Sequence, residues 1–324
     1  EEISFKEKKY AKKISSFTLN ESLKNGITSL ASFCTTSIES VDAIFEEAQK
    51  KQMCIVAGKT CMDRNGPLNL LDSPKRSYEE SEYLIKKWHS KNRLKYAITP
   101  RFAPTSTPKQ LELLGELSDR YKDCLIQTHL GEQEEEIEWV NRLFPDSIDY
   151  LQVYESFGLV NSMSIFGHSI HLTKRELKAL KEKRSSVAHC PTSNFFIGSG
   201  LFKIKNFIEE DINFGLATDT GGGTSFSMFK TMASAYYTAQ LNSYSLHPAQ
   251  LFWMSTVGSA KSLKLDDSIG NIKIGNFADL ITINLSSTPL IEERRKRSNN
   301  IWEELFPTII MGDERAISST WVSG

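Results

Sequence analysis

Several protein classes are excluded by what this 324-residue sequence lacks. No window approaches 18 consecutive apolar residues, so no segment is predicted to span a membrane. The opening residues, EEISFKEKKYAKK, are charged and have no apolar core of the kind found in a secretory signal peptide. Lys and Arg number 39 and Asp and Glu 40, for a formal net charge of −1. This balance gives no reason to expect a nucleic acid or a membrane surface as a partner, and we expect a cytoplasmic protein.

Cysteine is scarce and scattered. The five cysteines form no C-x-x-C pair, and three of them lie inside apolar segments. We therefore predict reduced, packed thiols in a reducing compartment rather than disulfides. They are Cys34, Cys54, Cys61, Cys124 and Cys190.

Short apolar runs alternate with longer helical patterns along most of the chain. Helical spacing after a Ser or Thr cap candidate is present in residues 37–51, 107–122 and 173–183. Buried strands separated by helices predict a parallel sheet. Seven such units favour a (β/α)8 TIM-like barrel of class α/β that lacks its first strand. The predicted strands are residues 26–33, 53–58, 96–100, 124–129, 163–168, 185–190 and 212–219.

The pattern changes toward the C-terminus. Two helical segments, 232–241 and 247–265, lead into IGNIKIGNFADLITINL, where glycines and alternating Ile and Leu indicate turns and short antiparallel strands. We expect a barrel domain over residues 1–268 and the remnant of a small β-sandwich domain over residues 269–324. The mixed charge run at 291–300 is interpreted as a solvated face or loop.

Polar residues fall at four predicted strand ends, where a barrel places its chemistry. They are His129, His168, His189 and Asp219. Each alone could be a core or capping residue, but three of six histidines at such positions favour one shared site. Neutral imidazoles with one carboxylate suit zinc or iron. Glu132, expected in the first turn of the helix that follows His129, is placed to move a proton between a metal-bound water and a substrate nitrogen.

Two competing local motifs fit poorly. The H-x-x-E of residues 129–132 is not the H-E-x-x-H of zinc proteases, which needs a second histidine on the same helix. The glycines of TDTGGGTS (218–225) lack the GK[ST] of a phosphate-binding loop. We interpret them as backbone freedom beside a crowded site.

Six motifs in order resemble the amidohydrolase superfamily, and within it the guanine deaminases. The resemblance extends along nearly the whole chain, and the GNIKIGNFADL segment resembles the return to the β-sandwich in superfamily members. MDRN together with PRFAPTS carries the resemblance to the guanine deaminases in particular. The six motifs are MDRN (62–65), ITPRFAPTS (98–106), QTHLGEQ (127–133), FGHSIHLT (166–173), AHCPTSN (188–194) and GLATDTGGGTSFSM (215–228).

The resemblance implies a role for each site residue. His129 and Asp219 are implied zinc ligands, and Glu132 is the implied proton shuttle. His168 is expected over the water or the substrate, which it would polarise, while Asp219 also accepts the water's proton. Glu132, His168 and Asp219 are thus the implied catalytic residues.

The resemblance also implies how the substrate is held. Arg101 and Phe102 are expected to bind the purine by hydrogen bonding and stacking, and His129, Glu132 and Asp219 also face it. Residues 189–194 are expected to wall the pocket, with His189 not required as a ligand. The implied reaction converts guanine to xanthine and ammonia by a zinc-activated water. A homodimer is plausible, with residues 232–241 as a candidate contact, although a barrel helix packed on the core is the preferred interpretation of that stretch.

One feature departs from the family. Its first strand carries an H-x-H pair that supplies two zinc ligands, and no H-x-H occurs in this sequence. We expect a chain truncated at both ends that, as written, binds zinc weakly and is inactive. Two alternatives remain open: a related deaminase acting on a triazine, a pterin or another purine, or a metal-free assembly protein on the same barrel.

Overall fold

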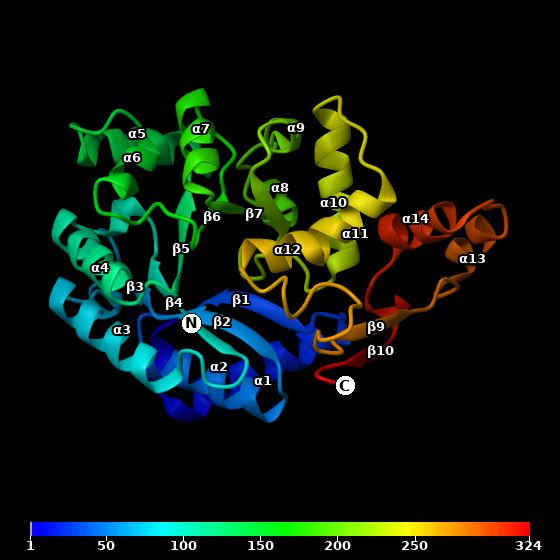
Figure 1. Cartoon of the computed structure of the whole chain (residues 1–324), viewed down its shortest axis with the longest axis horizontal. Helices are drawn as coiled ribbons and strands as arrows, with labels where there is room; N and C mark the ends of the chain where they lie inside the picture. The colour runs from blue at the N-terminus through cyan, green and yellow to red at the C-terminus, as the bar shows by residue number, and fades with distance from the viewer. Residues whose placement is uncertain (1) are drawn as a thin grey trace. The chain divides into compact units, whose positions relative to one another are not determined.

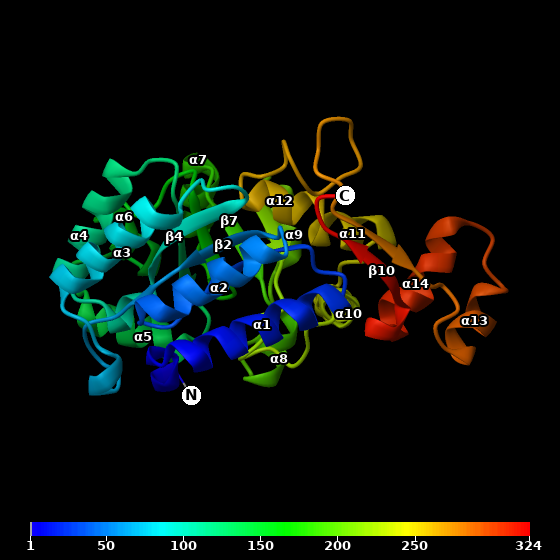
Figure 2. The ribbon, with the colours of Figure 1, turned by 90° about the horizontal axis from the view of Figure 1, so that it is seen from below.

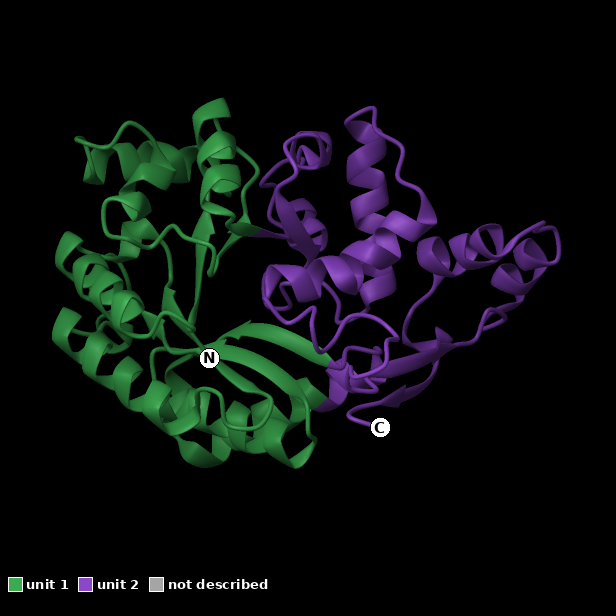
Figure 3. Cartoon of the chain, viewed as in Figure 1, with its two compact units in different colours: residues 1–19, 29–186 green, residues 20–28, 187–324 purple. Residues whose placement is uncertain are grey.

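The computed structural model describes residues 2–324 and divides the chain into two compact units. Unit 1 comprises residues 1–19 and 29–186, and unit 2 comprises residues 20–28 and 187–324; Figure 3 colours them separately. The domain division predicted after residue 268 stays a prediction.

Unit 1 is built on a parallel sheet with the strand order β1-β2-β4-β5-β6, and β3 pairs with the end of β4. All of its registered pairs are parallel, so the strands' carboxyl ends share one edge. The five longer strands confirm five of the predicted ones, whereas the two-residue β3 was not predicted. The strands are β1 (Ser29–Phe33), β2 (Cys54–Gly58), β3 (Thr60–Cys61), β4 (Leu94–Pro100), β5 (Leu125–Leu130) and β6 (Ser164–His168).

Helices separate these strands, as the alternating pattern predicts. Figure 1 shows α2, α3 and α4 beside the strands, and Figure 2 shows α1 lying along α2. Lys12 of α1 pairs with Glu46 of α2 at 2.7 Å. The helical elements are η1 (Glu2–Lys6), α1 (Lys8–Lys24), α2 (Ile38–Lys50), η2 (Leu68–Leu70), α3 (Pro74–Trp88), η3 (Ala103–Thr105), α4 (Pro108–Arg120), α5 (Glu134–Leu143), α6 (Tyr150–Glu155) and α7 (Lys174–Lys183).

Two of the three expected helix caps form. The hydroxyls of Thr107 and Thr173 accept the backbone N–H groups of Gln110 and Glu176, which satisfies donors that a helix start leaves unpaired. Ser37 precedes α2 but makes no side-chain cap. Its hydroxyl donates instead to the carbonyl of Phe5, at 3.1 Å, and so fastens η1.

The core of unit 1 follows the apolar periodicity. All five residues of β2 are buried, as a strand covered on both faces requires. On α4, Leu111, Leu114 and Leu117 recur at helical spacing and are fully buried. Burying a leucine side chain contributes about 1.5–3 kcal/mol, so this one face stabilises the helix on the sheet by several kcal/mol.

Unit 2 contains the two last predicted strands and most of the later helices. β7 begins with the last residue of unit 1 and is followed by β8; the Ala217 N–H donates to the His189 carbonyl at 2.8 Å. The elements are β7 (Ser186–His189), α8 (Pro191–Phe196), α9 (Ile204–Glu209), β8 (Asn213–Leu216), α10 (Met228–Leu241), α11 (Pro248–Ser255), α12 (Val257–Ser262), β9 (Leu280–Ile283), α13 (Pro289–Arg295), α14 (Ile301–Met311), η4 (Glu314–Ala316) and β10 (Ile317–Trp321).

The C-terminal region differs from the prediction in detail. The expected antiparallel pairing is present between β9 and β10, but the alternating residues 269–275 form no strand, because β10 supplies ladder partners only for residues 280–283. The helical pattern of 247–265 divides at Thr256, whose φ of −126° and ψ of −93° end α11. The charge run 291–300 is exposed over most of its length, as predicted, yet it begins within a helix, α13.

Two expectations about composition agree with the described residues. All five cysteines are reduced thiols, and four of them are buried. Within residues 2–324, no helix has the length and apolarity that crossing a membrane requires.

Candidate active site

Five of the six predicted site residues belong to unit 1, where they lie at or just after the carboxyl ends of β4, β5 and β6. Arg101 and Phe102 follow β4 directly, and His129 is the penultimate residue of β5. In the ladder, His129 stands opposite Gly167, and His168 ends β6. Parallel neighbouring strands present such residues at one edge, which is where barrel enzymes assemble their sites.

The ring of His129 is oriented by its neighbours. Its Nδ1 lies 2.7 Å from the carbonyl oxygen of Arg101. A carbonyl can only accept, so Nδ1 carries the proton and the lone pair of the neutral ring is on Nε2. The ring stacks on His168, with centroids 5.4 Å apart and planes 17° apart, and contacts Phe33 at 4.8 Å. A histidine fixed in this tautomer by a backbone carbonyl is typical of a metal ligand.

His168 is buried and adopts an uncommon backbone conformation. Its φ is +63°, and Ser169 follows at +51°, in the left-handed region that non-glycine residues seldom occupy. The Nδ1 of His168 lies 3.4 Å from Oε1 of Glu132. Backbone strain held at a buried histidine beside a carboxylate is a feature that clusters at functional sites.

Glu132 lies in a loop and not in a helix, which corrects the prediction. α5 begins at Glu134, after the cap residue Gln133. The side chain of Glu136 accepts the N–H of Glu132 at 2.9 Å and that of Gln133 at 3.2 Å, so it fills the cap role from within the helix. The chain therefore enters α5 two residues later than expected, and Glu132 remains at the strand edge, mostly buried, facing His168.

Arg101 and Phe102 are presented on a loop rather than buried. The Arg101 side chain is 42% exposed, and its Nη1 lies 3.6 Å from a carboxylate oxygen of Glu2. The Phe102 ring packs edge-on against His129 and Trp139, at 6.4 and 6.0 Å. A guanidinium and an aromatic ring side by side can bind a flat, polar heterocycle.

Tyr154 supports this site and was not predicted from the sequence. Its hydroxyl donates to the backbone carbonyl of His129 at 3.0 Å and accepts the N–H of Ala103 at 2.9 Å. Complete burial raises the pKa of this phenol, so the hydroxyl stays protonated as a donor. The residue comes from α6 and reaches β5 through a contact between residues 25 positions apart, which no local pattern signals.

Asp219 belongs to unit 2, three residues beyond the end of β8. Its φ is +48°, again in the left-handed region. The glycines that follow are needed for close approach: a Cβ on Gly223 would lie 1.9 Å from the carbonyl oxygen of Thr218, and one on Gly222 would lie 3.2 Å from Oδ2 of Asp219. The interpretation of TDTGGGTS as a crowded turn beside a site residue is consistent with this packing.

His189 also belongs to unit 2 and has the surroundings of a core residue. It is fully buried, and its ring stacks on Phe202 with centroids 4.2 Å apart and planes 17° apart. Phe202 in turn stacks on Phe207 at 4.3 Å. These contacts agree with ranking His189 below the other three strand-end residues.

A second cluster in unit 1 has metal-ligand residue types but unsuitable chemistry. His89, Asp123 and Cys124 lie within reach of one another. However, Nδ1 of His89 accepts the N–H of Tyr96 at 3.0 Å, so the proton of the neutral ring is on Nε2, 3.1 Å from Asp123. A nitrogen that donates a hydrogen bond has no lone pair for a metal. We interpret the cluster as a structural His–Asp pair.

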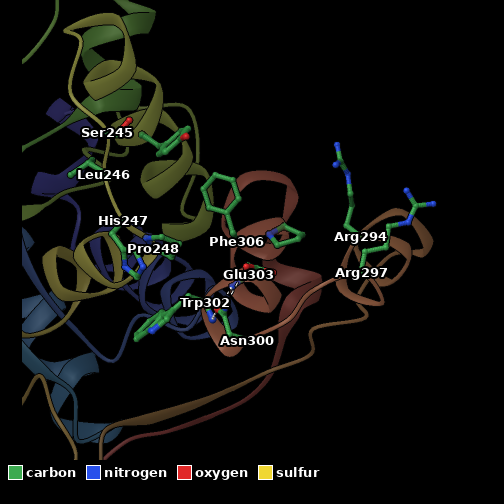
Figure 4. A pocket seen from close by; sticks show the side chains of 12 residues that line it. Ser245, Leu246, His247, Pro248, Arg294, Arg297, Asn300, Trp302, Glu303 and Phe306 are labelled. Carbon is green, nitrogen blue, oxygen red and sulfur yellow. Dashed lines mark hydrogen bonds between the residues drawn. The ribbon is translucent and has the colours of Figure 1, made fainter.

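Unit 2 contains a pocket of about 740 Å³ that none of the predicted site residues line. Tyr236, Trp302 and Phe306 contribute aromatic surface to it. Figure 4 shows the guanidinium groups of Arg294 and Arg297 directed away from the rings of Trp302 and Phe306. Because its charged groups do not converge, the pocket lacks the arrangement expected of a site that binds a polar ligand.

Comparison with known proteins identifies the family. Residues 6–324 match the amidohydrolase family. The chain belongs to the amidohydrolase family. This result confirms the predicted α/β class and TIM-barrel type of fold, and amidohydrolases are typically metal-dependent.

Among amidohydrolases, the chain is similar to guanine deaminases. It is 43% identical over 320 residues to the guanine deaminase of Escherichia coli strain K12, and the alignment covers 99% of this chain and 73% of that protein. The solved structure of an E. coli guanine deaminase aligns with a TM-score of 0.98 over 100% of this chain and 76% of the other. A guanine deaminase from C. acetobutylicum, solved with guanine in its active site, aligns at 31% identity with a TM-score of 0.91, over 100% of this chain and 77% of the other. These likenesses confirm the predicted resemblance.

Proposed function

We propose that this amidohydrolase is a guanine deaminase, which hydrolyses guanine to xanthine and ammonia. The observation that carries the proposal is the approach of Glu132 to His168 at 3.4 Å, beside His129 and the loop that presents Arg101 and Phe102. The 43% identity to a guanine deaminase supports the choice of substrate.

A divalent metal fits the donor set of this chain. His129 directs the proton of Nδ1 to a backbone carbonyl, which leaves Nε2 as the nitrogen with ligand character. Asp219 supplies a carboxylate, and its backbone is in the left-handed region, with a φ of +48°. We assign both as ligands, with zinc as the proposed metal. When bound, zinc supplies a Lewis acid that makes water a nucleophile near neutral pH.

Glu132 moves the proton. Its carboxylate is mostly buried, comes from a loop at the strand edge and lies 3.4 Å from Nδ1 of His168. It takes one proton from the water and delivers it to the ring nitrogen N3 of the base. Asp219 accepts the second proton, which passes to the 2-amino group, so that this group leaves as ammonia and the carbon keeps the oxygen of the water.

His168 orients the reacting groups. It is buried, fixed between the ring of His129 and the carboxylate of Glu132, and its backbone conformation holds it at this edge. A polar side chain so constrained pre-organises the water and the oxygen of the substrate, which lowers the reorganisation needed during reaction.

Arg101 and Phe102 bind the base. Guanine presents O6 and N7 as adjacent acceptors, and a guanidinium can donate to both at once. The Phe102 ring supplies a face or an edge for the purine. We also propose that the protein acts in the cytoplasm as a homodimer, with exposed Tyr237 and Leu241 of α10 as contact candidates. Another face of that helix, which includes Phe229, Met232 and Ala239, is buried.

A panel assay for ammonia release tests the proposal. The natural gene product that carries this sequence, loaded with zinc, is offered guanine, adenine, an aminotriazine and a pterin. We expect turnover of guanine at least a hundredfold faster, by kcat/KM, than of the other three compounds, about 2.7 kcal/mol of discrimination. Turnover of the triazine or the pterin with none of guanine would reject guanine as the substrate.

A further inference from the structure

The MDRN segment, residues 62–65, runs beside the loop that presents Arg101 and Phe102. The two segments leave neighbouring strands: Thr60 pairs with Thr99 and Cys61 with Pro100. The Arg101 N–H then donates to the Cys61 carbonyl at 3.1 Å. The two loops therefore begin from one fixed point at the carboxyl edge of the sheet.

Asp63 holds the far end of the presenting loop. One oxygen of its carboxylate accepts the Thr107 N–H at 2.7 Å, and the other accepts the Thr107 hydroxyl at 2.5 Å. The backbone N–H of Asp63 donates to the Thr105 carbonyl at 2.9 Å. Hydrogen bonds to an ionised acceptor are stronger than neutral ones, so this pair sets where the loop ends and α4 begins.

Arg64 holds the middle of the loop. Its Nη2 donates to the Ala103 carbonyl at 3.1 Å, and its guanidinium lies 4.9 Å from the centre of the Phe144 ring. Partial burial lowers the pKa of this arginine, and the neighbouring charge of Asp63 opposes that effect. The ring and the carbonyl together fix the orientation of the guanidinium.

Asn65 holds the next position. Its amide nitrogen donates to the Pro104 carbonyl at 2.7 Å, and its φ is +52°. Asparagine tolerates this left-handed conformation better than most residues, and its short amide reaches the neighbouring loop from it. Thus three consecutive side chains bind three positions of the presenting loop.

Tyr154 also holds this loop. The N–H of Ala103 donates to the Tyr154 hydroxyl, while the carbonyl of Ala103 accepts from Arg64. Because Tyr154 also donates to the backbone carbonyl of His129, the loop is tied to the strand that carries the proposed metal ligand. The Arg101 side chain, at the start of this loop, is 42% exposed.

We propose that Asp63, Arg64 and Asn65 are positioning residues, which act through Arg101 and Phe102 to set the affinity for the base. The inference rests on the proposed function. None of the three is expected to touch the reacting atoms, so their loss weakens substrate binding and leaves the chemical step nearly intact.

The test compares steady-state constants for guanine in the zinc-loaded natural gene product that carries this sequence. Asp63→Asn removes the charge that Thr107 binds, and Asn65→Gly keeps the left-handed backbone while removing the side chain. We expect KM to rise about tenfold for each, with kcat within about threefold of the natural sequence. Asp146→Asn, at an exposed carboxylate, is the matched control and leaves both constants unchanged.

A double variant separates positioning from a general loss of stability. If Asp63 acts through Arg101, then Asp63→Asn combined with Arg101→Lys has nearly the KM of Arg101→Lys alone. Additive effects on KM, or a fall in kcat with KM unchanged, would overturn the inference.

The outcome for the natural sequence distinguishes the two proposals. Absence of guanine turnover in that protein rejects the proposed function. Normal turnover there, with an unchanged KM in both Asp63→Asn and Asn65→Gly, rejects the positioning role alone.

Discussion

The Nδ1 of His168 lies 3.4 Å from Oε1 of Glu132, across the carboxyl ends of two neighbouring parallel strands. The pair joins a buried imidazole in a left-handed conformation to a carboxylate from a loop. We propose that the pair serves proton transfer at this edge of the sheet.

Replacing Glu132 with Gln tests its role as the proton carrier. The amide keeps the size of the side chain but cannot accept a proton. We expect kcat for guanine to fall by about 10²–10⁴-fold while KM changes little. Steady-state kinetics measures both constants. The control is Glu134→Gln, at a neighbouring side chain that is 82% exposed, which keeps full activity. A kcat within threefold of the natural value in Glu132→Gln would rule out the role.

Replacing His129 with Ala tests its role as a metal ligand. The change removes the Nε2 lone pair, and we expect zinc affinity to fall more than ~100-fold, beyond the loss known for residues that only support a ligand. Competition with a chromogenic chelator measures the affinity. His247→Asn is the control, because asparagine can also cap α11 at that position. Equal zinc affinity in His129→Ala and the control would contradict the assignment.

Replacing Arg101 with Lys tests recognition of the base. Lysine keeps the charge but cannot donate to two adjacent acceptors. We expect KM to rise ~10–100-fold with kcat unchanged. Arg120→Lys, at a guanidinium that is 60% exposed, is the control and leaves KM at the natural value. If Arg101→Lys lowers kcat and leaves KM unchanged, Arg101 acts in the chemical step and not in binding.

Replacing Lys59 with Met tests a buried ion pair that follows β2. Lys59 is fully buried, contacts Asp72 and lies 3.3 Å from Glu80. Burial lowers its pKa, but the neighbouring carboxylates of Asp72 and Glu80 oppose that effect, and the pKa is raised overall. Burial has the opposite effect on the carboxyl group of Asp72, whose pKa it raises. Removing the lysine leaves a buried carboxylate without its cation, and we expect a loss of about 3–5 kcal/mol in unfolding free energy at neutral pH.

The sign of the pH dependence follows from Asp72. Without Lys59, its folded-state pKa moves further above the unfolded value of about 3.9. A group with a raised folded pKa stabilises the fold at low pH, and this stability is lost as the pH rises through that pKa. Urea denaturation should therefore show a smaller deficit for Lys59→Met at pH 5 than at pH 8. Lys75→Met, 81% exposed, is the control. A deficit that does not change with pH would contradict the account.

Much of the architecture could be predicted because local pattern determines it. The buried run that became β2 is apolar on both faces, and β5 begins with an apolar Leu-Ile pair. Thr107 and Thr173 cap the helices they precede. The histidines at strand ends were apparent for the same reason: a parallel sheet brings those ends together. Their assigned roles in metal binding and catalysis stay predictions.

The rest depends on contacts between distant residues. The start of α5 was misplaced because Glu136 reaches back to the N–H groups of Glu132 and Gln133. The support of the site by Tyr154 and by Asp63 relies on hydrogen bonds over 25 and 44 positions, which no periodicity encodes. The sequence identifies MDRN as a motif, but it does not show that these side chains bind the loop of residues 101–107. Only the structure shows those hydrogen bonds.

Product analysis of guanine in ¹⁸O-labelled water tests the central claim most directly. The zinc-loaded natural gene product that carries this sequence is incubated with guanine, and the product is identified by mass spectrometry. The account predicts xanthine with one ¹⁸O atom and one equivalent of ammonia, because the oxygen that replaces the 2-amino group comes from water. Recovery of unchanged guanine, under conditions where the same protein releases ammonia from another heterocycle, would contradict it.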